Sequence, residues 1–159
     1  MNLHKRHQGF SLIELLLVVA IIGIISAIAV PNLLASKRAA NEGSAVASVR
    51  TITSAEATYQ ATTGVGSYGS LANLNTAGLV DSALSGSTIA APKSGYAFTA
   101  DADATTPNSQ YLTTASTSVA SGVTASGSRN FASDSTGVVT YVAASTTAMT
   151  SNNGTPIGN

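Results

Sequence analysis

Apolar residues are concentrated near the N-terminus of this chain. An almost unbroken apolar run extends from Leu15 to Val30 and ends at Pro31. Counted from Phe10, about twenty residues precede the proline, and as a helix they would cross a hydrocarbon core roughly 30 Å thick. The pattern therefore predicts a membrane-spanning helix over residues 10–31.

A second helical pattern follows the proline. Residues 32–62 contain no further proline, and their larger apolar side chains recur at spacings near three and four, which is typical of an amphipathic helix. Thr62, Thr63 and Gly64 then supply a stop signal. One helix from Phe10 to about Ala61 would be roughly 75–80 Å long, far longer than a small globular domain requires.

Two residues weaken this helix. Pro31 lacks the N–H that would donate to the carbonyl of Ala27, so we expect a kink there. Gly23 lowers helix stability by about 1 kcal/mol relative to alanine. Both residue types are also frequent in ordinary membrane helices, so by themselves they assign no function.

The rest of the chain is predicted to be an antiparallel sheet packed on the amphipathic helix. The β-prone runs are 93–100, 110–115, 128–133 and 137–142. Turn residues 134–137 between the last two predict a hairpin. We expect a fold of class α+β with about four strands in a head over residues 63–142, and a helical or irregular connector over residues 71–84. Residues 143–159 offer little apolar surface, which predicts a flexible tail.

The core of this head is predicted from the largest apolar side chains at helix and strand periodicities. The helix contributes Val46, Val49, Ile52 and Tyr59, and the strands contribute Tyr96, Phe98, Leu112, Phe131, Val139 and Tyr141.

The start of the apolar run carries a specific motif. A short basic segment, residues 1–9, leads into Phe10-Ser-Leu-Ile-Glu14. A cleavable secretory signal would have a shorter apolar region that ends in small residues. A plain membrane anchor would not explain Glu14, because a carboxylate in a bilayer costs roughly 2.5 kcal/mol or more and by default marks a function. The segment from Gly9 to Val49 resembles the type IV prepilin family, whereas the resemblance of the head is weak.

The resemblance implies how the chain is processed and assembled. Residues 1–9 would be a leader that a prepilin peptidase and N-methyltransferase removes after Gly9, with N-methylation of the new terminal Phe10. Glu14 would meet the amine of Phe10 on a neighbouring subunit and set the register between them. The segment between Gly23 and Pro31 would partly unwind when subunits pack.

The expected function is that of a structural subunit of a type IV pilus-like filament, polymerising through its hydrophobic N-terminal helix. One alternative is a pseudopilin of a type II secretion system, and another is a membrane-tethered binding module that does not polymerise. The expected partners are further copies of the chain, the peptidase, inner-membrane pilus or secretion machinery, and lipid before assembly. The sequence does not distinguish between roles in adhesion, motility and DNA uptake, or between a major and a minor subunit.

Orientation in the membrane follows from the resemblance, because basic residues flank the span on both sides. Lys5 and Arg6 precede it, and Lys37 and Arg38 follow it, so the positive-inside rule gives nearly a tie. A cytoplasmic peptidase places the N-terminus in the cytoplasm, in a single-pass inner-membrane protein. After assembly, the head would lie at the cell surface or in the periplasm.

Composition argues against several other functions. Loss of Lys5 and Arg6 with the leader leaves five Lys and Arg against seven Asp and Glu. A chain with this charge balance lacks the excess of clustered basic residues that binds nucleic acid. Both histidines, His4 and His7, lie in the leader, and the chain has no cysteine. The mature chain therefore has neither residue for acid–base or nucleophilic catalysis, so we expect no enzyme. It also departs from the many pilins whose C-terminal loop is closed by a disulfide.

Calcium is the one metal that the sequence leaves open, and no other cofactor is expected. Asp101 and Asp103 would face the same way in an extended segment, with Asp81 or Asp134 as a further oxygen donor. Aspartates in loops are also ordinary turn formers. The resemblance also implies that calcium binding is possible, because major pseudopilins bind calcium in their heads.

Overall fold

The structure is a computed structural model that describes residues 9–158. The chain divides into two compact units, with the boundary between Ala35 and Ser36. Helix α1, Leu12–Ala61, contributes to both units and includes Pro31 without interruption. The long helix predicted from the sequence is confirmed, beginning two residues after Phe10.

The first unit is the apolar part of α1. Every side chain from Phe10 to Leu33 is exposed. An 18-residue window of α1 reaches a mean hydropathy of 2.9, and α1 is the one helix in residues 9–158 that is long and apolar enough to cross a membrane. Contact of so much apolar surface with water is unfavourable, so lipid or other protein must cover this segment.

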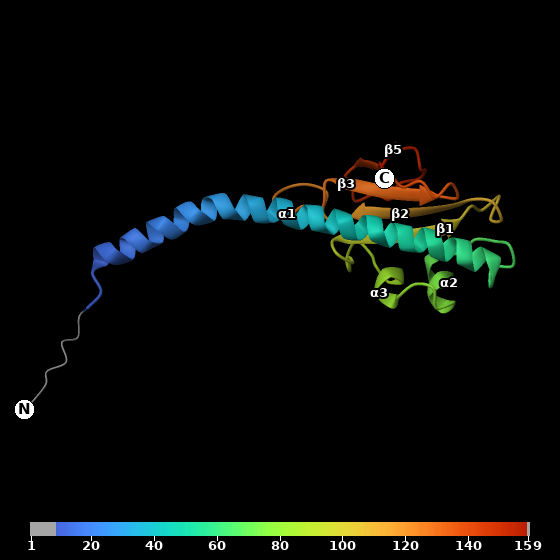
Figure 1. Cartoon of the computed structure of the whole chain (residues 1–159), viewed down its shortest axis with the longest axis horizontal. Coiled ribbons are helices and arrows are strands. Elements are labelled where there is room, and N and C mark those ends of the chain that lie inside the picture. Colours follow the sequence, from blue (N-terminus) through green and yellow to red (C-terminus); the bar gives the residue numbers. More distant parts are fainter. Residues whose placement is uncertain (1–8, 159) are drawn as a thin grey trace, which may run out of the picture. The chain divides into compact units, whose positions relative to one another are not determined.

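The second unit is the head, in which the C-terminal half of α1 packs on a five-stranded sheet (Figure 1). The strands follow one another as an antiparallel meander: β1 Tyr96–Ala102, β2 Tyr111–Thr117, β3 Arg129–Asp134, β4 Thr140–Ala143 and β5 Thr155–Pro156. Two short helices, α2 Leu71–Thr76 and α3 Ser82–Ser85, contact β1. The predicted α+β pilin-like fold is confirmed, with β5 as an additional strand.

The core lies between α1 and the helix-facing side of the sheet. Val49, Ile52, Tyr96 and Phe131 are fully buried, and Val46, Tyr59 and Tyr141 pack around its margin. The prediction for Leu112 was wrong. Leu112 pairs with Asp101 and Asp134 and lies on the outer face of the sheet, because side chains alternate along a strand and its neighbours Tyr111 and Thr113 face the helix. Connector residues that the prediction left out of the core complete it: Leu71, Leu74, Val80 and Leu84.

The C-terminal residues differ from the flexible tail that their composition predicts. Thr155 and Pro156 pair with β4 as strand β5, and Ile157 packs against the core. The Asn130 side chain is fully buried, where it donates to the carbonyl of Ser145 at 2.7 Å and accepts from the Thr117 N–H at 3.0 Å. Composition misses this because hydrogen bonds, rather than apolar burial, hold the segment.

Candidate functional site

The predicted processing site lies immediately before α1. Gly9 and Phe10 are not helical, and Phe10 is 79% exposed. The bond between them therefore lies outside the hydrogen-bonded helix. The preceding residues of the predicted leader, 1–8, lie outside the described part of the chain.

Glu14 caps the start of its own helix. The Ser11 N–H donates to Glu14 Oε2 at 3.0 Å. Ser11 precedes the first helical residue and Glu14 is the third, so the pair makes the carboxylate half of a capping box. The Ser-x-x-Glu spacing is a sequence signal for this role that our prediction did not use. Glu14 is also the only charged residue between Gly9 and Ser36.

The two residues predicted to weaken α1 lie in exposed positions. An added Cβ at Gly23 would meet no atom of the chain within 4 Å, so nothing within the chain requires glycine there. Pro31 is likewise exposed. Their proposed part in helix unwinding stays a prediction.

Comparisons with known proteins match this same N-terminal segment. A family described as "Prokaryotic N-terminal methylation motif" matches residues 4–30. The type IV wide pilus major component PilA4 of Thermus thermophilus is 53% identical over 38 residues, 24% of this chain and 29% of that protein. The type IV major pilin protein PilA of Myxococcus xanthus is 39% identical over 56 residues, 35% of this chain and 26% of that protein.

The N-terminal segment of this chain is therefore type IV pilin-like. The match spans less than a third of the length of either relative. No solved structure matches significantly.

The pilin-like head contains a half-buried ion pair between α1 and the sheet. Arg129 donates to Glu42 Oε2 from both Nε and Nη2, at 2.9 and 2.7 Å, and the Ser128 N–H donates to Oε1 at 2.7 Å. Burial alone would raise the pKa of Glu42, but these hydrogen bonds outweigh it and the pKa is lowered. The pair fixes β3 against α1. A glutamate on the inward face of an amphipathic helix is the signal that could have identified it.

A second glutamate of the pilin-like head is buried without a cation. The side chain of Glu56 is fully buried, its Oε2 accepts from the Gly69 N–H at 3.0 Å, and its Oε1 has no partner. Burial raises its pKa to about 7, and Asp101 adds to the shift. Glu56 therefore loses its proton near neutral pH at a cost to the folded state.

We expect the head to become less stable as the pH rises from 5 to 8. The folded-state pKa of Glu56 exceeds its ordinary value of 4.5, so its contribution to stability is complete below that value and is lost as the pH passes 7. A shift of this size corresponds to a loss on the order of 3 kcal/mol. The head, residues 36–158, contains no histidine that would titrate in this range. Urea unfolding at pH 5 and pH 8 measures the difference.

Two variants test the assignment to Glu56. Glu56→Gln keeps an acceptor for Gly69 and should flatten the pH dependence. Asp81→Asn, an exposed change that keeps an N-capping side chain on α3, should leave it as in the wild type. If the free energy of unfolding of Glu56→Gln fell between pH 5 and pH 8 as steeply as that of the wild type, a group other than Glu56 would cause the pH dependence.

Three of the predicted calcium ligands line one groove at the end of the sheet, whereas Asp81 lies elsewhere, as the N-cap of α3. A groove of about 440 Å³ is lined by Asp101, Asp103 and Asp134 among others. Asp103 Oδ1 already accepts from the backbone N–H groups of Thr105 and Thr106, both at 2.8 Å. Within residues 9–158, no three His, Cys, Asp or Glu side chains are placed so that they could hold a metal ion together. Calcium binding stays a prediction.

Proposed function

We propose that the mature chain is a structural subunit of a type IV pilus-like filament that polymerises through residues 10–31. The observation that carries this proposal is the exposed apolar segment of α1, in which Glu14 is the single charge. The relatives named as a pilus major component and a major pilin match the same segment.

Burial of the apolar segment supplies the driving force for both stages of this function. Full burial of one Leu, Ile or Val side chain contributes about 1.5–3 kcal/mol. Before assembly, lipid covers these side chains in a single-pass inner-membrane protein whose N-terminus is cytoplasmic. After assembly, the N-terminal helices of neighbouring copies cover them, and the heads lie outside the inner membrane.

Glu14 is proposed to select how neighbouring helices pack. Cleavage after Gly9 creates a positive amine on Phe10, four residues before Glu14. A carboxylate in an apolar environment is costly unless an opposite charge neutralises it. Pairing with the Phe10 amine of a neighbouring copy therefore favours one axial step. Gly23 and Pro31 would let the intervening helix adapt to this packing.

A type II secretion pseudopilin shares the same N-terminal requirements and is the second candidate. The names of the two relatives favour the pilus. Long filaments sheared from the cell surface would support the pilus, whereas short assemblies that stay in the periplasm would support the pseudopilin. A membrane-tethered binding module would need neither cleavage nor self-association.

We expect processing between Gly9 and Phe10. Intact-mass measurement of the native protein should give a chain that begins at Phe10 and carries one added methyl group. Gly9→Val should keep residues 1–9 attached, because the bulkier side chain alters the residue before the cleaved bond. A native N-terminus at Met1, or beyond Val30, would refute the proposed function.

A further inference from the structure

The head has two ends that differ in charge, and each is fixed by contacts with α1. At the base, where α1 enters the head, Arg38 Nη2 donates to the carbonyl of Gly122 at 2.9 Å and Asn41 donates to that of Ser126 at 2.8 Å. At the tip, Gln60 donates to the carbonyl of Asn108 at 2.6 Å. At 1.5 Å per residue, α1 separates these ends by roughly 35 Å.

Acidic side chains gather at the tip. Asp101 on β1 and Asp134 on β3 both pair with Leu112 of β2, so the three lie in one row across the sheet. Asp103 follows in the loop after β1. These three aspartates line the groove of about 440 Å³, and no basic side chain lines it. Asp103 and Asp134 accept hydrogen bonds within their own turns, whereas Asp101 has no described hydrogen bond or ion pair.

The basic side chains of the head lie on α1 at Lys37, Arg38 and Arg50, on β3 at Arg129, and before β1 at Lys93. Arg129 is paired with Glu42, and Lys93 with Asp81 at 3.8 Å. Arg38 is bound to backbone carbonyls. Within the described part of the head, Lys37 and Arg50 are the basic side chains with no described hydrogen bond or ion pair.

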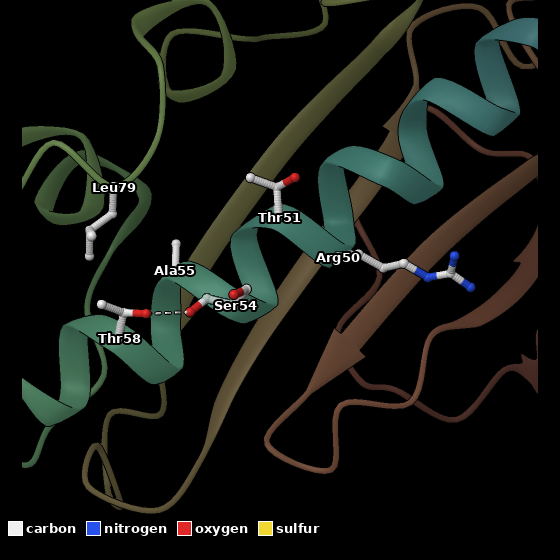
Figure 2. A pocket seen from close by; sticks show the side chains of 6 residues that line it. All are labelled: Arg50, Thr51, Ser54, Ala55, Thr58 and Leu79. Atoms are coloured by element: carbon white, nitrogen blue, oxygen red, sulfur yellow. Dashed lines mark hydrogen bonds between the residues drawn. The ribbon is translucent and has the colours of Figure 1, made fainter.

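Arg50 lines two grooves along α1, and the first, which it shares with Leu79, is the one that Figure 2 draws. The second, here called the Arg50 groove, has a volume of about 460 Å³ and is lined by Gly43, Val46, Ile157 and the Glu42–Arg129 pair as well as Arg50. Because Glu42 and Arg129 neutralise each other, the groove carries one net positive charge. Figure 2 shows the Arg50 side chain extending from α1 on the side away from Leu79. It is thus free to contact another molecule.

We propose that the acidic groove at the tip of one head binds the Arg50 groove of a second copy of the chain. The two surfaces lie on different parts of the same head and have opposite charge, so the contact is heterologous and generates an open-ended array. This inference rests on the proposed filament function. It adds a polar, salt-sensitive contact between heads to the apolar contact between N-terminal helices.

Disulfide cross-linking tests the contact directly, because the chain has no cysteine of its own. The full-length variants Arg50→Cys and Asp101→Cys are co-expressed and oxidised in intact cells. We expect a cross-linked dimer that contains one copy of each variant. Ala72→Cys, exposed on α2 and outside both grooves, is the matched control and should give little dimer with Asp101→Cys.

Charge reversal supplies a second readout. Arg50→Glu and Asp101→Lys should each lower the yield of sheared filaments about tenfold by placing like charges together, and the double variant should recover most of it. Filaments at wild-type yield in both single variants, together with no Arg50–Asp101 cross-link, would overturn the inference. Cross-linking equal to that of the Ala72 control would also overturn it.

The same design separates this inference from the proposed function. If the wild-type chain forms no filaments, the proposed function fails, and the cross-link in membranes still reports on the contact. If chelation of divalent cations abolishes filaments and no cross-link forms, the acidic groove binds a cation instead and the inference is wrong.

Discussion

Glu14→Ala should abolish most filament formation while the protein still inserts in the membrane. Insertion should be unchanged or improved, since the substitution removes a carboxylate that costs roughly 2.5 kcal/mol or more in a bilayer. Polymerisation should fall at least about tenfold, because each 1.4 kcal/mol of lost pairing energy has that effect. Filament yield and membrane fractionation, measured on the same cells, separate the two effects.

Glu14→Gln distinguishes the two roles of this side chain. Glutamine keeps an oxygen that accepts from the Ser11 N–H, and it also serves in capping boxes, but it carries no charge to pair with the Phe10 amine. We therefore expect Glu14→Gln to be as defective as Glu14→Ala. Normal filaments in Glu14→Gln, with a defect in Glu14→Ala, would show that the capping contact with Ser11 matters and the charge does not.

Phe131→Ala should remove a large part of the stability of the head. Phe131 is fully buried on β3, with its ring centroid 5.9 Å from that of Tyr96 and 5.6 Å from the Arg129 guanidinium. Removal of such a side chain costs about 3–5 kcal/mol, and the total stability of a small domain is roughly 5–15 kcal/mol. Thermal unfolding of residues 36–159, followed by circular dichroism, measures the loss.

An exposed valine provides the matched control for Phe131. Val123 is 74% exposed in the loop between β2 and β3. Val123→Ala should change the free energy of unfolding by no more than about 0.5 kcal/mol. If Phe131→Ala were equally mild, the core would not lie between α1 and β3.

Local patterns were sufficient for the parts of this protein that interact mainly with their sequence neighbours. The apolar run and the spacing from Val46 to Tyr59 gave one helix to Ala61, as observed. Alternation and turn residues gave β1 to β4 in order. The motif Gly9 to Glu14 by itself resembles that of the type IV prepilin family. These features depend on periodicity and on residues close in the chain.

Side-chain direction was less predictable. Leu112 was assigned to the core because it is large and apolar, yet strand register places it beside Asp101 and Asp134 on the outer face. A shift of one residue exchanges the two faces of a strand. No local signal fixed that register.

The sequence by itself determined the long helix, the class of fold and the N-terminal segment proposed for processing and assembly, because each depends on a local pattern. Tertiary structure alone decided how the polar residues are used. It buried Glu56 without a cation, paired Glu42 with Arg129 across 87 residues, and let Asn130 hold a polar tail. These outcomes depend on which distant groups fold against each other, and the free energy of a buried polar group depends entirely on such partners.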